Sequence, residues 1–336
     1  MKSEFIEKTV CVLGASIVAN GGFVYDLRSY FHSAKEKCCF YNRGIGGNRA
    51  IMAPALAEDE ILSLKPDYAM ICYGVNDVGI WLYDINKKVT DGVLQERAER
   101  DFLFYQGYKQ IAEKLLKLGV QPIICSPFPP NKYFKNAAEV NTLGDNREKS
   151  DNVRSGFYCP QNLTALFEKL AEYSENLKKY ANDAGLLFWD IFGAVAKKAD
   201  GVSGEGVYEK DGIHISERGH ALIAQAILEF MECENIPRSF EKSCENDAIK
   251  SAEERERAIQ YFDWGMFHPL CNAKGTREEI VRISESEKTE EWLKKFAAIY
   301  LAHGQEKDKI RKEIIRLTRE FCLRSSAERF KADSNG

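Results

Sequence analysis

Residues 9–16 read Thr-Val-Cys-Val-Leu-Gly-Ala-Ser, and this stretch decides the fold. Its first five residues form a short run that is apolar on both faces of an extended chain, as burial between two layers of helices demands. The glycine and the serine then stand where the strand passes into a helix. Open sheets of this kind hold their ligands at the carboxyl ends of the strands. The stretch therefore predicts a buried parallel strand with Ser16 at the edge of the sheet that carries a site.

The same alternation of short apolar runs and longer amphipathic segments continues through the first two thirds of the chain. This pattern predicts a parallel sheet covered by helices, and the fold class is therefore α/β. The predicted strands are residues 9–13, 38–42, 68–73, 120–126 and 186–189. The predicted helices lie near residues 20–33, 48–63, 96–118 and 161–184, with another after Ser216.

The bulk composition argues against several classes of function. The chain has 336 residues, of which 44% are hydrophobic and 29% are charged, as in ordinary globular proteins. Its 47 basic and 51 acidic residues leave a net charge of -4, so no global field attracts nucleic acid or anionic membranes. We expect no nucleic-acid partner and no segment that spans a bilayer.

The N-terminal residues and the cysteines bear on the cellular compartment. Residues 1–8 alternate charged and apolar side chains and lack the apolar run of a secretory signal, so we expect a cytoplasmic protein. The ten cysteines are scattered, and several fall in strand-like runs. No C-x-x-C pair occurs to bind zinc, so reduced and mostly buried thiols are the expectation. The sequence indicates neither a metal nor another cofactor.

The pattern changes near residue 233, which predicts two domains, residues 1–233 and 234–336. The second is predicted to be a helical C-terminal extension, because it contains helix-start signatures such as the capping box at 251–254, Ser-Ala-Glu-Glu. Apolar residues recur in it at helical spacing, at Leu293, Phe296, Ala297 and Tyr300, and again at Ile310, Ile314, Leu317 and Phe321. Such stripes pack either against the chain's own core or against a second subunit, which would make a homo-oligomer.

Two long connections interrupt the first domain. Residues 127–158 exceed the usual length of a connection and form either a lid over the site or a disordered surface loop. Residues 75–93 carry Trp81, Leu82 and Tyr83 directly after a predicted strand. These three side chains line an acyl or sugar pocket, or else cover the core.

Three strand ends carry residues that chemistry can use. Ser16 is either a nucleophile or a helix N-cap, and neither a G-x-G-x-x-G nor a G-x-S-x-G motif surrounds it. The second strand ends in residues 42–48, Asn-Arg-Gly-Ile-Gly-Gly-Asn, whose glycines let backbone N–H groups approach a ligand. The third ends in residues 74–77, Gly-Val-Asn-Asp, where the amide of Asn76 either points into the same crevice or closes an Asx turn.

Residues 211–214, Asp-Gly-Ile-His, place a carboxylate near an imidazole at the start of a helix. A neutral histidine takes a proton from a hydroxyl when a third group fixes its tautomer and orientation, and Asp211 is suited to that role for His214. The pair alone also fits simple helix capping. The other histidines have weaker claims: His220 suits packing, His32 ends a helix, and His268 and His303 lie in the extension.

Taken together, these blocks are much more specific than any of them alone. Ser16, Gly47, Asn76 and the pair Asp211/His214 follow the order and positions of the SGNH hydrolases, also called the GDSL lipase/acylhydrolase family. The chain resembles a member of this family.

The resemblance implies a flavodoxin-like three-layer α/β/α sandwich with a five-stranded parallel sheet. It implies Ser16 as the nucleophile, His214 as the general base and then acid, and Asp211 as the carboxylate that orients the histidine. The implied oxyanion hole consists of the N–H of Ser16, the N–H of Gly47 and the side-chain amide of Asn76.

The resemblance covers roughly residues 8–232 and has one plain departure. The first block of the family usually reads Gly-Asp-Ser, and this chain has Ala15 where the aspartate stands. The change puts in doubt the local support of the nucleophile turn but not the proton-transfer chain. We prefer Gly47 to Gly46 because the glycine of the family lies five residues after the asparagine of its block, here Asn42.

Two hypotheses of function follow from the sequence. The first is a metal-independent serine esterase or acylhydrolase that cleaves a small-molecule carboxylic ester through an acyl-enzyme on Ser16, with small acetylated or sugar esters as a narrower guess. The second is a catalytically weak relative that uses the crevice to bind a ligand or the helical extension to assemble. A fluorophosphonate probe discriminates between them, because only an activated serine reacts readily.

Overall fold

The computed structural model describes residues 2–34, 37–54, 61, 64–83, 87–134, 162–200, 206–240, 244–267, 294, 302 and 305–321. The chain divides into two compact units, Met1–Glu241 and Lys242–Gly336. Residues 234–240 belong to the first unit, where the Tyr30 hydroxyl donates to the carbonyl of Glu234 (2.6 Å) and the Gln225 amide donates to the carbonyl of Pro237 (2.9 Å). The predicted division into residues 1–233 and 234–336 stays a prediction.

A five-stranded parallel sheet lies at the centre of the first unit, as the α/β prediction requires. Its strands are β1 (Lys8–Gly14), β2 (Cys38–Gly44), β3 (Tyr68–Cys72), β4 (Gln121–Cys125) and β5 (Leu187–Trp189). Their order in the sheet is β2-β1-β3-β4-β5. After β1 the chain first adds a strand on one side and then on the other, so the order reverses between β1 and β3. The crevice at such a reversal is where open α/β sheets hold their ligands.

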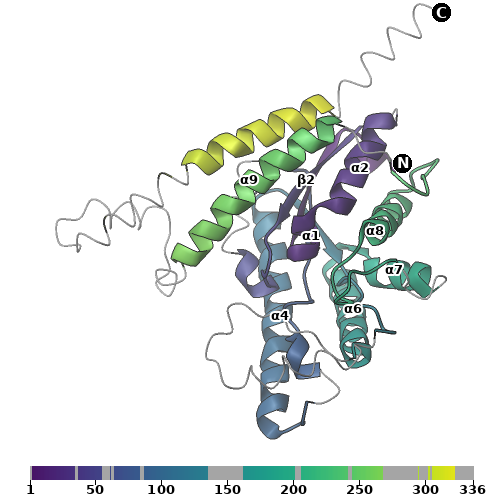
Figure 1. The fold of residues 1–336 in the computed structure, drawn as a ribbon, viewed down its shortest axis with the longest axis vertical. Coiled ribbons are helices and arrows are strands. Elements are labelled where there is room, and N and C mark those ends of the chain that lie inside the picture. Colours follow the sequence, from purple (N-terminus) through teal and green to yellow (C-terminus); the bar gives the residue numbers. More distant parts are fainter. Residues whose placement is uncertain are drawn as a thin grey trace, which may run out of the picture. The chain divides into compact units, whose positions relative to one another are not determined.

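One face of the sheet packs against α1 (Ser16–Asn20), α2 (Gly22–Ser33), α7 (Ile191–Asp200) and α8 (Glu217–Phe230). Alternate residues of β1, Val10 and Val12, point into this core together with Phe23 and Leu27 of α2 and Ile227 of α8, all with no exposed surface. Figure 1 shows α2 and α8 side by side. The predicted helix near residues 20–33 is α2, whereas the short α1 was not predicted; Gly21, with a left-handed φ of 78°, separates the two.

The long helices α4 (Asp91–Lys117) and α6 (Thr164–Ala184) pack against the sheet from the other side. The buried hydroxyl of Tyr108 on α4 lies within hydrogen-bonding distance of three backbone carbonyls at strand ends and donates to one of them. These are the carbonyls of Ile71 (3.2 Å), Tyr73 (3.1 Å) and Cys125 (3.1 Å). The same hydroxyl also accepts the N–H of Tyr73 at 3.0 Å. One side chain of α4 therefore satisfies backbone groups at the carboxyl ends of β3 and β4, where the site lies.

The smaller differences from the prediction lie at helix ends. Within the helix predicted near residues 48–63, the structure has the 3₁₀ turn η2 (Ala50–Met52). Residues 55–60 and 62–63 of that prediction lie outside the described residues. Helix α4 begins before residue 96, where Thr90 caps it by accepting the N–H of Val93 (3.4 Å). Helix α7 was not predicted. Two further 3₁₀ turns are η1 (Ser3–Phe5) and η3 (Ile80–Tyr83).

The described part of the second unit is helical, in agreement with the prediction. It contains α9 (Cys244–Phe267) and a helix at 305–321. The capping box at 251–254 does not start a helix, because α9 has already begun at Cys244. Arg311 forms a buried ion pair with Glu256 (2.6 Å). Of the predicted stripe, Ile310, Ile314 and Phe321 are buried and Leu317 is half-buried. The earlier stripe, Leu293, Phe296, Ala297 and Tyr300, lies outside the described residues.

Two further expectations can be compared with the described residues. No helix among them is both long and apolar enough to cross a membrane. Cys38, Cys72 and Cys125 are buried free thiols. Assembly of the chain into a homo-oligomer through its C-terminal helices stays a prediction.

Candidate active site

Ser16, His214 and Asp211 form a continuous hydrogen-bonded chain. The Ser16 Oγ lies 3.1 Å from His214 Nε2, although the two residues are 198 positions apart. His214 Nδ1 lies 2.5 Å from Asp211 Oδ2. Because a carboxylate only accepts hydrogen bonds, Nδ1 must carry the proton between His214 and Asp211. Nε2 is then left as the acceptor that faces the serine hydroxyl.

Asp211 is held in place by the turn that it begins. Its Oδ1 accepts the backbone N–H groups of Ile213 (2.9 Å) and His214 (2.9 Å), while its Oδ2 faces the imidazole. Burial raises the pKa of the Asp211 carboxyl, but the hydrogen bonds from His214 and from these N–H groups outweigh it and lower the pKa to about 2. Asp211 is therefore charged throughout the neutral range.

His214 responds to the same pair in the opposite direction. The hydrogen bond that His214 Nδ1–H donates to Asp211 raises the pKa of the His214 imidazole, burial lowers it, and the charges of Asp211 and Glu209 raise it further. The net effect is a pKa above the ordinary value of histidine. The imidazole is thus a stronger base than a free histidine.

The turn that carries Asp211 and His214 is fixed from outside. The N–H of Asn131, in the loop after β4, donates to the carbonyl of Gly212 at 2.8 Å. Gly212 has a left-handed φ of 69°, and a Cβ there would lie 2.6 Å from the ring of Phe134. The position therefore requires glycine both for its backbone and for the close approach of the aromatic ring. The described part of the predicted 127–158 connection, residues 127–134, packs against this turn, and its remainder lies outside the described residues.

Ser16 is placed by the end of β1. Gly14 lets the strand end pass close to β3, because a Cβ there would lie 2.8 Å from the carbonyl oxygen of Cys72. Ala15 then occupies the N-cap position of α1, where its methyl group offers no acceptor to the helix N–H groups. An aspartate at this position would provide one. The departure from the Gly-Asp-Ser block thus removes a possible cap from α1 and leaves the distance between Ser16 and His214 suitable for a hydrogen bond.

The two remaining blocks of the predicted site meet each other at the same edge of the sheet. The Asn76 side-chain nitrogen donates to the carbonyl of Asn48 at 3.0 Å, which joins the loop after β3 to the loop after β2. An asparagine amide has a second N–H for a ligand. Gly47 is exposed, and it adopts a left-handed φ of 74° with open space around its Cα. Ile45, two residues before Gly47, donates its N–H to the carbonyl of Gly14 (3.0 Å), two residues before Ser16.

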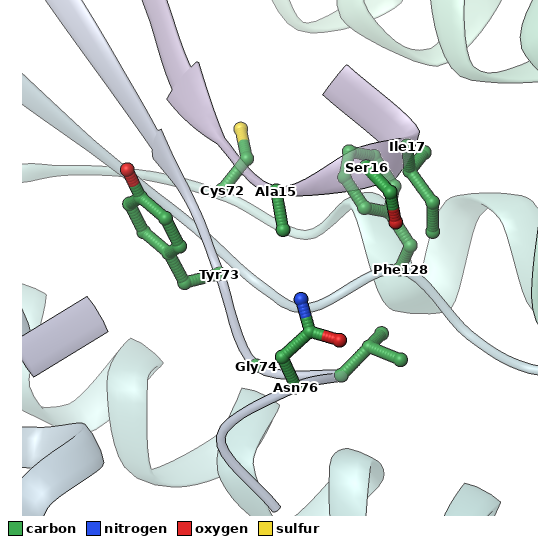
Figure 2. Close-up of a pocket in the computed structure, with 9 residues that line it drawn as sticks. Ala15, Ser16, Ile17, Cys72, Tyr73, Gly74, Asn76 and Phe128 are labelled. Atoms are coloured by element: carbon green, nitrogen blue, oxygen red, sulfur yellow. The ribbon is translucent and has the colours of Figure 1, made fainter. Parts of the chain in front are cut away.

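A small pocket opens between Ser16 and Asn76. Figure 2 shows Ser16 at the end of β1 and the amide of Asn76 pointing into the pocket from the loop after β3. The cavity volume is about 20 Å³, little more than the roughly 10–15 Å³ that one water molecule needs. The pocket is lined by Ala15, Ser16, Ile17, Cys72, Tyr73, Gly74, Val75, Asn76 and Phe128.

The three aromatic and apolar residues singled out after the third strand have different positions. Leu82 is buried in the core. Trp81 is 41% exposed and packs under the guanidinium of Arg100 (4.5 Å from the ring centre), and Tyr83 packs in the same way under Arg97 (4.3 Å). The residues that line the small pocket do not include these three.

The other histidines lie away from the hydrogen-bonded residues Ser16, His214 and Asp211. His220 is buried in α8 against Phe23 (ring centres 6.0 Å apart), as the packing interpretation predicts, and burial lowers its pKa to about 4. His32 lies in the last turn of α2. His268 and His303 fall outside the described residues. Among the described side chains, no cluster of three or more His, Cys, Asp or Glu residues is placed to hold a metal ion.

The five-stranded parallel sheet with helices on both faces is the α/β fold of the SGNH hydrolases. The chain belongs to the GDSL-like lipase/acylhydrolase family, whose model matches residues 12–222. The sequence gives no significant match among curated proteins. The family match includes every block that carried the resemblance, from Ser16 to His214.

Solved structures share the fold at low sequence identity. A gut microbial diltiazem-metabolizing enzyme aligns over 94% of this chain and 96% of its own, with a TM-score of 0.58 and 13% identity. A catalytic mutant of an acetylxylan esterase from Geobacillus stearothermophilus aligns over 70% of this chain and 98% of its own, with a TM-score of 0.49 and 17% identity. The first alignment is long enough to include much of the second unit.

Several residues at the site were not predicted from the sequence. The carbonyl of Asn48 accepts from Asn76, Phe128 lines the pocket, and Asn131 holds the turn of Asp211. Their contacts join segments that are far apart along the chain, so residue type alone carries no signal for them. Asp77 is different, because a carboxylate five residues after the end of a buried strand, next to Asn76, is visible in the sequence.

Proposed function

We propose that the protein is a serine esterase that cleaves short-chain carboxylic esters through an acyl-enzyme intermediate. The observation that carries the proposal is the hydrogen-bonded chain Ser16–His214–Asp211, with the amide of Asn76 facing the same pocket. Membership of the GDSL-like lipase/acylhydrolase family supports the same class of reaction.

The first half of the reaction acylates the serine. The Ser16 Oγ attacks the ester carbonyl carbon while His214 Nε2 takes the hydroxyl proton, and Asp211 stabilises the resulting imidazolium. The negative charge moves to the former carbonyl oxygen, where the N–H groups of Ser16 and Gly47 and the amide of Asn76 are proposed to donate. The tetrahedral intermediate then collapses. His214 returns the proton to the leaving alcohol oxygen, and the acyl group stays on Ser16.

The second half releases the acid. A water molecule attacks the acyl carbon, and His214 Nε2 takes one of its protons. The same donors stabilise the second oxyanion. As the C–O bond to Ser16 breaks, the imidazolium returns the proton to the serine oxygen, which restores the starting hydroxyl. The balance is one ester and one water consumed, and one carboxylic acid and one alcohol formed.

The size of the pocket favours a short acyl group. We expect kcat/KM to fall by at least about tenfold between p-nitrophenyl acetate and p-nitrophenyl octanoate, because a pocket this small excludes a long chain. A matched variant, Val75→Ala, removes two methyl groups from the wall and should raise the octanoate rate relative to the acetate rate. Steady-state kinetics on the acyl series measure both. Equal rates for acetate and octanoate would contradict the assignment of this pocket to the acyl group.

The rate should depend on pH through His214. Because the base must be neutral, kcat/KM should fall tenfold per pH unit on the acid side, below an apparent pKa higher than that of a free histidine. Asp211→Asn removes the carboxylate that raises the pKa of His214, so its acid limb should move to lower pH. A pH–rate profile of both proteins measures the shift. An acid limb at the same pH in the variant would argue against the pairing of His214 with Asp211.

A further inference from the structure

Asp77, the residue after Asn76, connects the two loops that carry predicted oxyanion donors. Its side chain is buried, with 4% of the residue exposed. Its Oδ1 accepts the N–H of Ala50 at 2.8 Å. Ala50 begins η2 and lies three residues after Gly47. The Asp77 carboxylate, in the loop after β3, therefore holds the loop after β2 at a point three residues from Gly47.

A second hydrogen bond crosses between the same loops. Asn76 donates to the carbonyl of Asn48 at 3.0 Å, while its neighbour Asp77 accepts from Ala50. Adjacent residues of one loop thus bind the other loop at two points, and the two hydrogen bonds run in opposite directions. Two attachment points fix an orientation as well as a distance, which one bond does not.

Helix α4 holds both partners of this contact. Gly107 of α4 packs on the backbone of η2 so closely that a Cβ there would lie 2.4 Å from the carbonyl carbon of Ala50. The Arg100 Nη1 on the same helix donates to the backbone carbonyl of Asp77 at 3.2 Å. Asp77 and Ala50 therefore contact each other and also both contact α4.

The burial of the Asp77 carboxylate is costly. Burial raises the pKa of the Asp77 carboxyl to about 7, against the N–H of Ala50 and the charge of Arg49, which lower it. Its Oδ2 has no hydrogen-bond partner among the described residues. A buried polar oxygen without a partner destabilises the folded state. A smaller side chain would avoid that cost and would lose the bond to Ala50.

We propose that Asp77 is a positioning residue that keeps the Gly47 N–H and the Asn76 amide aimed at one oxyanion, through its hydrogen bond to Ala50. The inference rests on the proposed esterase function and adds a specific residue to it. Asp77 touches neither the serine nor the pocket; it acts through the relative placement of the two loops. Its effect should therefore appear in the transition state more than in substrate binding.

The test compares two substitutions on p-nitrophenyl acetate. Asp77→Ala removes the acceptor, and we expect kcat to fall by about ten- to a hundredfold, because displaced donors lose transition-state stabilisation, with KM changed much less. Asp77→Asn keeps an oxygen at the Oδ1 position and should retain kcat within about threefold of the parent, because the hydrogen bond is preserved. Thermal unfolding of each variant reports whether it is folded. If Asp77→Ala does not fold, Asp77→Ser, whose oxygen is one bond too short to reach Ala50, replaces it.

A double substitution separates positioning from a general structural role. If Asp77 acts by aligning the two donors, the fold loss caused by Asp77→Ala should be smaller in the Asn76→Ala background, where only the Gly47 N–H remains to be positioned, than in the parent. A defect that merely loosens the fold would multiply the two losses. A general structural defect of this kind would also lower the unfolding temperature of Asp77→Asn and raise the KM of the Asp77 variants.

The outcomes distinguish this inference from the proposed function. Absence of Ser16-dependent ester hydrolysis in the unmodified protein would overturn both. Hydrolysis that depends on Ser16, together with an undiminished kcat in Asp77→Ala or its serine replacement, would overturn the role of Asp77 alone. A loss of kcat in Asp77→Asn as large as that in Asp77→Ala would also overturn the role of Asp77. Fully multiplicative losses in the double variant would do the same.

Discussion

Ser16→Ala is expected to lower kcat/KM for p-nitrophenyl acetate by about 10⁵-fold or more, because the acyl-enzyme can no longer form. The side chain changes by one oxygen atom, so the thermal unfolding temperature should stay close to that of the parent. Any residual rate reports the water reaction assisted by the remaining donors. Hydrolysis at the parental rate in the folded variant would exclude Ser16 as the nucleophile.

A covalent probe provides the control for the same position. A fluorophosphonate should label Ser16, since only a serine activated by a base reacts readily, and mass spectrometry of the peptides locates the adduct. Ser126 is the matched serine at the same edge of the sheet, directly after β4: it is buried, and its hydroxyl donates to Asp190 (3.1 Å). We expect no adduct there. An unlabelled Ser16 in a folded protein would favour the alternative that the crevice only binds a ligand.

His214→Ala should produce a loss of similar size, about 10⁵-fold in kcat/KM, because the hydroxyl of Ser16 then has no base to take its proton. The two losses should not add: a variant that lacks both Ser16 and His214 should be about as slow as either single variant, since the groups act as one unit. Steady-state kinetics and the rate of fluorophosphonate labelling measure the effect.

Two variants bracket this result. Asp211→Asn should cost less, on the order of 10³- to 10⁴-fold, because it disturbs the tautomer and the charge of the base without removing the base. His32→Gln changes a histidine in the last turn of α2 and should retain the parental rate. A His214→Ala variant that labels and turns over like the parent would remove the imidazole from the mechanism.

The sequence was most informative where the residue type itself carries the physical signal. Apolar runs located the five strands, because strands buried between helices have few polar side chains. It was less informative at helix boundaries. The short α1, which Gly21 separates from α2, was not predicted, and α7 was missed although Asp190 directly before it accepts the N–H of Gly193 (2.9 Å) as an N-cap. The capping box at 251–254 was misleading because Ser-x-x-Glu also occurs inside helices, here in α9.

By itself, the sequence determined the class of the fold and the order of the blocks Ser16, Gly47, Asn76 and Asp211/His214 along the chain. Both depend on local patterns and on residue identity. Only the tertiary structure decided that Ser16 and His214 lie within hydrogen-bonding distance, because the packing of the chain brings the end of β1 and the turn before α8, 198 residues apart, to one edge of the sheet. It also decided the size of the pocket and the contact of Asp77 with Ala50. These features arise from how separate segments pack, and no single segment encodes them.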